Sequence, residues 1–420
     1  MAVREDEQDD ERVGTDRWRA ATVGRVSGPY DLAVVGLGPV GAAALRHAAR
    51  RGVRAVGVGP GEPADFASHR GAFASHYDSG RITRHLDRRF VWAELARRAI
   101  AEYPVIEAGG EPFHRPVGAI YAVDDATAAA ELREVAHRLA PAGVRWRETV
   151  GSPDERIGLH PDATVFVEGP PAGHVDPRRL VRAQLTAARS LGAQAIDAEV
   201  EGLERFERRG RSWSLRLRDG GEVEAALVLI ATGPHADEIA GVARHPTVEV
   251  VAETVVVAAL DTDECRRLDG LPSVIAPTDH PVYDGCYLVP PTQYPDGTTC
   301  IKLGAEPRRT RVLATAADRR AWMRGDDHTA ELPGLLEVLH ALVPGLRPAR
   351  AGTKPCLIAT TRSGLPVIDH VDDGVVTVAG CNGYAAKSSD ALGALGVSLA
   401  LEGRWTDAVL DGESFRLGAG

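Results

Sequence analysis

The segment that begins at Asp31 constrains the fold more than any other part of the chain. It reads DLAVVGLG, then PVGAAALRHAARRG, then VRAVGVG. The first and third runs are apolar, as buried parallel strands are, and the middle run has helical character with a closing glycine. Together they span about 30 residues, which is the length of one βαβ unit. The sequence therefore predicts a strand, a helix and a second parallel strand here.

The turn between the first strand and the helix, residues 36–41, reads GLGPVG and is a G-x-G-x-x-G motif. Its first glycine allows a tight turn, its second lets a pyrophosphate approach the backbone, and its third allows the helix to pack closely on the strand. The helix N-terminus adds free N–H groups and the positive end of a dipole. A strand before the motif and a helix after it are the context that it requires. We expect a dinucleotide to contact Gly36, Gly38, Pro39, Val40 and Gly41.

The second strand departs from the usual pattern. It should end in Asp or Glu, which would accept a hydrogen bond from the adenosine ribose. This chain has Gly59 at that point, and Glu62 follows three residues later as a candidate replacement. The motif alone therefore does not separate FAD from NAD.

Composition excludes several classes of protein. The 420 residues are 44% apolar with a net charge of −10, and no strongly basic block follows the first thirty residues, so nucleic acid is not expected as a partner. The five cysteines lack paired C-x-x-C spacing, which favours reduced thiols in a cytoplasmic protein, and no metal cluster stands out. No apolar run is long enough to cross a membrane, and the acidic N-terminus lacks a signal-peptide core. We predict that residues 1–28 are a disordered acidic extension.

The arrangement of segments predicts an α/β + β fold. Residues 177–192 suit an amphipathic helix with Asp176 as N-cap and Pro177 at its first position, and residues 247–261 suit a long strand. Mixed helix and strand segments occur at the beginning, middle and end of the chain, with strand-rich segments between them. We predict a discontinuous Rossmann-like nucleotide-binding domain and a mostly antiparallel β-sheet substrate domain. The first domain takes residues 29–112, 170–245 and 346–420, and the second takes 113–169 and 246–345.

A second motif, SHYDSGRITRH at residues 75–85, follows the βαβ unit. In this segment the chain resembles monomeric sarcosine oxidase and its relatives in the D-amino-acid-oxidase-like flavoprotein superfamily, which carry Ser-His…Arg-x-x-Arg-His at this point. The resemblance extends from about Asp31 to about Arg404. Further matching segments, in the same order and spacing, are AGHVDPRRLVRAQLTAARSLGA, LVLIATGPHA, CIKLGAEP, KPCLIATTRSGLPVID and AGCNGYAAKSS. The resemblance implies FAD as the cofactor.

The resemblance also implies roles for individual residues. Lys302 would lie by the flavin face where oxygen reacts, and Arg81 would offset negative charge on the reduced ring. Arg84 and Lys387 would bind a substrate carboxylate, although Arg84 has a ready alternative in a salt bridge with nearby Asp87. The further flavin-binding positions are Ser75, His76, Gly80, Arg81, Thr232, Gly233, Gly383 and Lys387. Cys356 would form a thioether to the 8-methyl group of the flavin, and the alternative for this residue is an ordinary buried cysteine.

Two departures from the family concern the substrate. The family usually has His where this chain has Glu306, and often has Gly-His-Gly where this chain has Gly-Tyr-Ala before Lys387. We therefore expect a substrate other than sarcosine, and Glu306 would suit a substrate with a second positive group. Tyr287 lies in a segment that lines the substrate cavity of relatives.

These features predict a FAD-dependent amine oxidase. Its substrate would be an amino-acid-like secondary, N-alkylated or cyclic amine, molecular oxygen the acceptor, and an imine and hydrogen peroxide the products. One alternative is a dehydrogenase that passes electrons to a carrier instead of oxygen. Others are a flavin-binding subunit without turnover of its own and an NAD-binding protein. We expect a monomer or homodimer.

Overall fold

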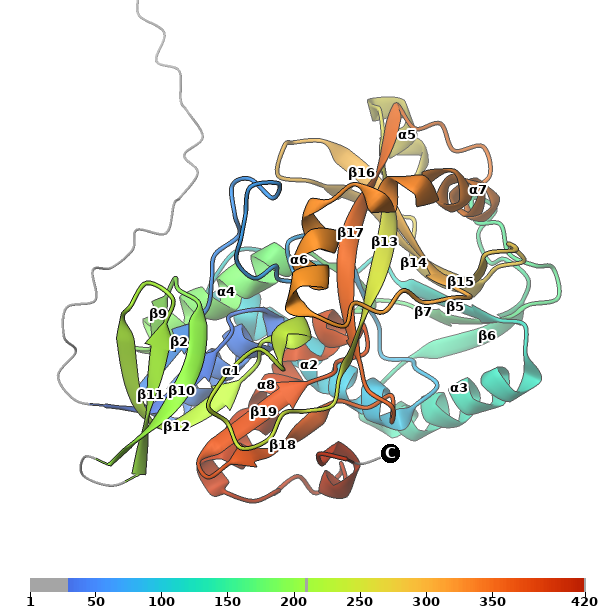
Figure 1. Ribbon diagram of the computed structural model, residues 1–420. Helices are drawn as coiled ribbons and strands as arrows, with labels where there is room; N and C mark the ends of the chain where they lie inside the picture. Colours follow the sequence, from blue (N-terminus) through green and yellow to red (C-terminus); the bar gives the residue numbers. More distant parts are fainter. Residues whose placement is uncertain (1–28, 208–210, 419–420) are drawn as a thin grey trace, which may run out of the picture.

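The computed structural model describes residues 29–207 and 211–418, and the predicted acidic extension lies outside the described residues. Two eight-stranded sheets and one small sheet make up its β-structure (Figure 1). This agrees with the predicted α/β + β class. No helix in the described ranges is long and apolar enough to cross a membrane.

The first sheet contains the predicted βαβ unit. Its central strands run parallel in the order β9, β2, β1, β12 and β19, and antiparallel strands extend both β12 and β19. The strands are β1 (Tyr30–Val35), β2 (Ala55–Val58), β9 (Gln194–Ile196), β10 (Val200–Glu207), β11 (Arg211–Leu217), β12 (Glu222–Ile230), β18 (Val367–Asp372) and β19 (Val375–Ala379). The strands of this sheet come from the beginning, the middle and the end of the chain.

Helices cover the first sheet and pack on one another. They are α1 (Pro39–Arg50), α2 (Phe90–Ala108), α4 (Pro177–Ser190) and α8 (Ala385–Glu402). The predicted N-cap of α4 is confirmed, because the Asp176 carboxylate accepts a hydrogen bond from the backbone N–H of Arg179 and Pro177 begins the helix. Gly393 lets α8 approach α1 closely, since a Cβ at that position would lie 2.6 Å from the backbone nitrogen of Ala44.

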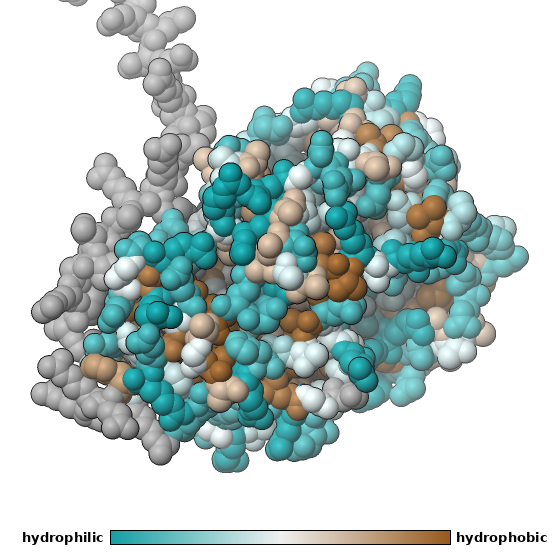
Figure 2. Space-filling view, viewed as in Figure 1, coloured by the Kyte–Doolittle hydropathy of each residue, from teal (hydrophilic) through white to brown (hydrophobic). Residues whose placement is uncertain are grey.

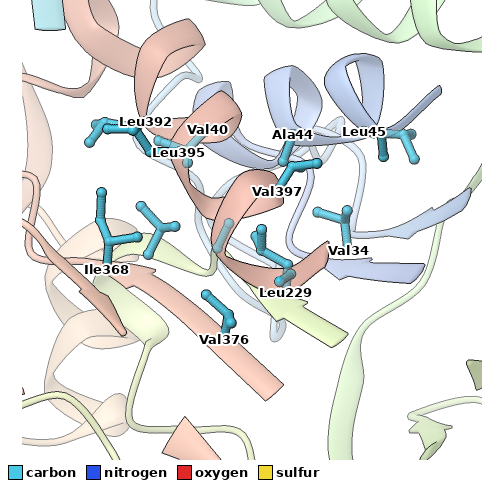
Figure 3. Close-up of a cluster of buried hydrophobic side chains, with 14 of the residues drawn as sticks. Val34, Val40, Ala44, Leu45, Leu229, Ile368, Val376, Leu392, Leu395 and Val397 are labelled. Atoms are coloured by element: carbon cyan, nitrogen blue, oxygen red, sulfur yellow. The ribbon is translucent and has the colours of Figure 1, made fainter. Parts of the chain in front are cut away.

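The apolar core of this unit lies between α1, α8 and the sheet. Figure 3 shows Val34 and Leu229 of the sheet facing Ala44 of α1 and Val397 of α8. These side chains are fully buried, and burial of such groups is the main favourable contribution to folding. The packing fixes both helices over the same end of the sheet, where the candidate site lies.

The second sheet is mostly antiparallel, with one parallel pair, β5 and β14. Its strands, in spatial order, are β17 (Arg350–Thr360), β13 (Glu249–Ala259), β16 (Thr299–Pro307), β15 (Tyr283–Gln293), β14 (Ser273–Pro277), β5 (Ala119–Val123), β7 (Thr164–Glu168) and β6 (Trp146–Val150). In Figure 1, β17 and β13 run side by side between the first sheet and the rest of the second. The division into domains stays a prediction; β17, assigned to the nucleotide-binding domain, pairs within the second sheet.

The remaining elements complete the structure. The small sheet consists of β3 (Arg81–Thr83), β8 (Gly173–Val175) and β4 (His114–Arg115). The other α-helices are α3 (Ala126–Leu139), α5 (Thr262–Arg267), α6 (Ala316–Arg324) and α7 (Leu332–Leu342). Figure 2 shows a largely hydrophilic face on which apolar residues form several small groups instead of one broad patch.

Candidate active site

One cavity of about 740 Å³ extends from the glycine turn before α1 to the first turn of α8. Its walls combine the carboxyl ends of parallel strands in the first sheet, where α/β proteins bind ligands, with parts of β13, β16 and β17. The predicted residues that line it are Gly36, Gly38, Pro39, Val40, Ser75, His76, Arg81, Arg84, Thr232, Gly233, Tyr287, Glu306, Cys356, Gly383 and Lys387. Gly41, Gly80 and Lys302 lie outside its lining.

The glycine turn contains glycines that protein contacts require and one glycine that leaves space for a ligand. Gly36 has a φ of +91°, and a Cβ there would lie 2.6 Å from the carbonyl oxygen of Ala231. A Cβ on Gly41 would lie 1.7 Å from the carbonyl oxygen of Gly36. At Gly38, the N-cap of α1, the nearest atom to a Cβ would be Nδ1 of His76, at 3.8 Å. Protein atoms thus demand glycine at 36 and 41, whereas at 38 the protein leaves room for the close approach of a ligand.

Three buried side-chain atoms of the lining have no hydrogen-bond partner among the described residues: Nδ1 of His76, Oγ1 of Thr232 and Nε of Arg84. Buried polar groups normally have partners, because a hydrogen bond left unmade there costs free energy. Burial, with Arg178 as the main positive neighbour, lowers the pKa of His76 to about 3, so this imidazole is neutral near pH 7. All three residues line the cavity, so a polar ligand bound there could supply the missing partners.

A buried ion cluster centred on Asp78 lies beside the middle of the cavity. The Asp78 carboxylate accepts hydrogen bonds from Nζ of Lys302 at 2.7 Å, from the hydroxyl of Tyr294 at 3.1 Å and from the guanidinium of Arg81. Arg81 also donates to the carbonyl oxygen of Ser75 at 3.0 Å. Arg81 lines the cavity, whereas Lys302 lies outside its lining and is bonded to the same carboxylate.

The charges in this cluster shift one another's pKa values. Burial, with added repulsion from Arg81, lowers the pKa of Lys302 to about 8, although Asp78 opposes this shift. Burial would raise the pKa of Asp78, but Lys302, Arg81 and Lys354 together hold it well below its usual range. Two cations therefore surround one carboxylate, and the cluster is positive overall at neutral pH.

A second ion cluster, centred on Asp87, lies at the other end of the cavity. Oδ2 of Asp87 accepts hydrogen bonds from Nζ of Lys387 at 2.9 Å and from Arg84 at 3.1 Å. The guanidinium of Arg84 also lies over the ring of Tyr121, and Lys387 lies over the ring of Tyr384. The salt bridge between Arg84 and Asp87 thus exists, but it is buried and faces the cavity. Burial and the charge of Arg84 lower the pKa of Lys387 to about 8.

Glu168, at the end of β7, holds the loop that carries Arg84. Its carboxylate accepts hydrogen bonds from the backbone N–H groups of His85 and Leu86, each at 2.9 Å, and is also bonded to the His85 ring. The carbonyl oxygen of Leu86 in turn accepts a hydrogen bond from Arg84 at 2.7 Å. The second sheet therefore fixes the position of the guanidinium.

The β17, β15 and β16 strands supply the remaining lining residues of interest. Sγ of Cys356 lies 3.6 Å from Nη2 of Arg81. The ring of Tyr287 lies across Gly304 of the neighbouring strand, where a Cβ would come within 2.4 Å of it. Glu306 lies two residues further along β16, at the exposed side of the cavity.

The turn before α8 brings the N-terminus of this helix to the cavity. Gly380, Asn382 and Gly383 all have positive φ values, and Asn382 is the only non-glycine residue in the described ranges that does. The Asn382 side chain supports this turn by accepting a hydrogen bond from the N–H of Thr361 at 3.0 Å. A helix N-terminus favours negative charge nearby.

Comparison with known proteins agrees with this site. The model of the FAD dependent oxidoreductase family matches residues 31–399. The chain belongs to this family. It is therefore a FAD-dependent oxidoreductase with a FAD-binding Rossmann-like fold. No curated protein sequence matches the chain.

Solved structures share the fold over nearly the whole chain. NikD, an unusual amino acid oxidase essential for nikkomycin biosynthesis, is 18% identical with a TM-score of 0.69, over 93% of this chain and 98% of NikD. L-proline dehydrogenase from P. horikoshii is 17% identical with a TM-score of 0.69, over 93% and 97%. Glycine oxidase from Geobacillus kaustophilus is 21% identical with a TM-score of 0.63, over 93% and 99%. At these identities the likeness establishes the fold.

The residues present fit FAD. The free space at Gly38 and the N–H groups of α1 suit the pyrophosphate, and Nδ1 of His76 and Oγ1 of Thr232 would gain the partners that they lack in the protein alone. The flavin end of the cofactor could be held between Arg81 and the N-terminus of α8. Glu62, the candidate ribose contact, is instead engaged with Arg178 at 2.6 and 2.7 Å and lies outside the cavity lining.

The structure also explains why position 59 is a glycine and not an acidic residue. A Cβ there would lie 2.5 Å from the backbone nitrogen of Leu37, so the close approach of the glycine turn leaves no room for an acidic side chain. Glu199 lines the cavity instead; it accepts a hydrogen bond from the N–H of Ala72 at 2.7 Å and forms an ion pair with Arg218 at 2.8 Å.

Sequence reasoning missed three buried acids. Asp78 and Asp87 organise the two ion clusters described above, and of these contacts the sequence indicates only the pairing of Asp87 with Arg84. Glu253 of β13 lines the cavity, and burial together with the negative charges of Glu306 and Glu331 raises its pKa to about 8. A signal for Glu253 was present, because it is the only charge in the run VVAETVVV.

Proposed function

We propose that this flavoprotein is an amine oxidase for amino-acid-like substrates. It oxidises the C–N bond of a secondary, N-alkylated or cyclic amine, uses molecular oxygen as acceptor, and yields an imine and hydrogen peroxide. The observation that carries the proposal is the pair of cations Arg84 and Lys387, which line the cavity and are both bonded to the buried Asp87. Two cations share one carboxylate there, so the cluster keeps one net positive charge that can bind the carboxylate of a substrate.

The structure supports this role for Arg84 in particular. Its Nη1 is bonded to Asp87 and Leu86, while its buried Nε has no partner among the described residues. A guanidinium binds a carboxylate through charge-assisted hydrogen bonds, and the ring of Tyr121 keeps its plane in place. The carboxylate of an amino acid would satisfy the free donor and orient the amine.

The bound FAD would accept the hydride equivalent of the amine and transfer its electrons onward. On the protein side, Arg81 and Lys302 supply fixed positive charge where negative charge develops during these steps. Asp78 holds both cations by hydrogen bonds. The charge is therefore in place before the reaction, and no side chain has to move to provide it.

Cys356 is proposed as the site of covalent attachment. Its Sγ faces the cavity 3.6 Å from the guanidinium of Arg81. A thioether to the flavin 8-methyl group would fix the ring against β17. Tyr287 and Glu306, which line the same cavity, are proposed to contact the substrate.

The names of the similar structures support the substrate class. An unusual amino acid oxidase, an L-proline dehydrogenase and a glycine oxidase all act, by name, on amino acids. Because one of these proteins is a dehydrogenase, transfer of electrons to a carrier is the alternative to transfer to oxygen. The test must distinguish the two.

The experiment combines anaerobic and aerobic measurements on the purified chain. N-methyl amino acids and cyclic imino acids are mixed with it without oxygen, and bleaching of the flavin absorbance is followed. Peroxide is then measured in air. Bleaching with peroxide release is the expected result. Bleaching with dye reduction but no peroxide would establish the dehydrogenase, and no bleaching by any compound would contradict amine oxidation by this chain alone.

A further inference from the structure

A row of residues crosses three neighbouring strands of the second sheet on the cavity side. Glu253 of β13 lies opposite Cys356 of β17. Val255 of β13 lies opposite Gly304 of β16, which is the last pair between these strands, and Glu253 and Glu306 each lie two residues beyond it. Residues directly opposite in a sheet point to the same face. Both glutamates line the cavity, which agrees with this placement.

The Glu253 carboxyl is buried without a partner. Its residue is 8% exposed, and no hydrogen bond or ion pair joins it to any residue that the structure describes. Like charges opposite each other in a sheet are destabilising, and a buried carboxyl without a hydrogen bond costs free energy. Burial, and after it the negative charge of Glu306, raises the pKa of Glu253 to about 8, so this carboxyl is largely protonated near pH 7. The positive charges of Arg81 and Lys302 act on this pKa in the opposite direction, but neither side chain forms an ion pair with Glu253.

The other charged groups near Glu253 are already engaged. Arg81 and Lys302 are both bonded to Asp78. Glu331, a further negative neighbour, accepts a hydrogen bond from the hydroxyl of Thr254 at 2.8 Å. A positive group that entered the cavity would therefore find the two glutamates as its free acceptors on this wall.

The cavity thus has walls of opposite charge. Arg84 and Lys387 form a positive wall with an unused donor on Arg84. Glu253 and Glu306 form an acidic wall, on which Glu253 is largely protonated near pH 7 because its pKa is raised to about 8. An amino acid presents its carboxylate to the first wall and its side chain to other parts of the cavity. A neutral side chain would leave Glu253 and Glu306 uncompensated.

We infer that Glu253 and Glu306 form a cation-binding subsite, and that the substrate is an amino acid whose side chain carries a second positively charged group. This inference rests on the proposed function and narrows its substrate class to basic amino acids. The ammonium or guanidinium of the side chain is bound between the two carboxyl groups, while Arg84 and Lys387 bind the carboxylate.

The test compares two substrates that differ only in the terminal charge. Racemic Nα-methyllysine and racemic Nα-methylnorleucine are oxidised by the holoenzyme, and kcat/KM is measured for each. A hydrogen-bonded charge pair predicts a preference of about tenfold or more for the lysine compound. Glu306→Gln should reduce this preference, mainly through KM. Glu253→Gln combined with Glu306→Gln should remove it, because either carboxyl can carry the shared negative charge.

Asp284→Asn is the matched control. Asp284 is an exposed carboxylate of β15 that pairs with Arg308 and lies outside the cavity lining. Its loss should leave the preference unchanged. A double glutamate variant that keeps both a normal flavin spectrum and the preference would overturn the inference, as would a wild-type enzyme that oxidises the norleucine compound equally well. In both cases the proposed oxidase function would stand.

A binding measurement separates the subsite from turnover. The holoenzyme is titrated calorimetrically with 6-aminohexanoate and with hexanoate, which differ in the terminal ammonium group. Neither compound has an α-amine that could be oxidised, so the difference in affinity measures binding of the ammonium alone. Tighter binding of 6-aminohexanoate, lost in the double glutamate variant, supports the subsite even if no tested amine is oxidised. That combination would contradict the proposed function alone, and equal binding of both acids would contradict the subsite.

Discussion

Nζ of Lys302 lies 2.7 Å from Oδ2 of Asp78, and both side chains are buried. This pair places the lysine behind Arg81, outside the cavity lining. If Lys302 promotes the reaction with oxygen, it does so through its charge at short range and not through contact with a ligand in this cavity. Its charge is retained because Asp78 partly offsets the effect of burial on its pKa.

Replacement of this charge should slow reoxidation of the flavin. For Lys302→Met we expect the rate with oxygen to fall about 100-fold, in line with the loss of one preorganised charged donor. Stopped-flow mixing of the reduced enzyme with oxygen measures it. Lys354→Met is the control, because that ammonium lies 4.0 Å from the same carboxylate without being buried as Lys302 is. A Lys302→Met enzyme that reoxidises at the wild-type rate would refute the role.

Covalent attachment can be checked independently of activity. Acid precipitation of the wild-type protein should leave the yellow flavin in the pellet, and Cys356→Ala should release it to the supernatant. Cys381→Ala is the matched control, since Cys381 is a second cysteine in the lining of the same cavity. Mass spectrometry of the Cys356 peptide should show the added flavin mass. Release of the flavin from the wild-type protein into the supernatant would exclude attachment.

The parts of the site that sequence could predict are those formed by neighbours in the chain. Residues 36–41 are recognisable because strand, turn and helix follow one another, and the Asp176 cap because its partner is three residues away. Asp78 could not be placed, because its partner Lys302 is 224 positions distant and only the fold brings them together. Buried ion pairs of this kind leave no local pattern.

Gly59 and Glu253 show two different limits of prediction from the sequence. The reason for Gly59 is its contact with Leu37, which depends on how closely the glycine turn approaches β2. Glu253 stands out within an apolar run, but the register that sets it opposite Cys356 is a property of the assembled sheet. Its location in the cavity therefore required the structure.

A substitution at Gly38 can distinguish a glycine that the ligand requires from one that the fold requires. Gly38→Ala should change the stability of the apoprotein little, because the backbone there is extended and a Cβ has room. The gain of about 0.4–1 kcal/mol from a less flexible unfolded chain is offset by the poorer capping of α1 by alanine. The same methyl group should weaken FAD binding, since it would occupy the approach to the pyrophosphate. Thermal unfolding of the apoprotein and FAD titration, both in a Cys356→Ala background, measure the two effects.

Gly41→Ala provides the contrast for that test. Its Cβ would lie 1.7 Å from the carbonyl oxygen of Gly36, so both the stability of the apoprotein and FAD binding should suffer. If Gly38→Ala bound FAD as tightly as the parent protein, the pyrophosphate would have to lie elsewhere.

Lys387 predicts how substrate binding depends on pH. Burial and Arg84 lower its pKa to about 8, so the ammonium is charged below that pH and neutral above it. Affinity for a substrate carboxylate should therefore be highest below pH 8, and KM should rise as the pH increases through about 8. Lys387→Met should raise KM at pH 7 by about tenfold, the value of one charged hydrogen bond, and should lack this pH step.

The pKa of Lys302 is lowered to a similar value, so the two lysines must be distinguished by the step that they affect. Lys302 should govern the pH dependence of flavin reoxidation, and Lys387 that of anaerobic flavin reduction at low substrate concentration. Separate measurement of the two half-reactions in Lys302→Met and Lys387→Met assigns each step. A pH step in anaerobic reduction that persists in Lys387→Met would assign the step to a group other than Lys387. Glu253, whose pKa is also about 8, is then the first candidate, because Arg84 stays charged throughout this range.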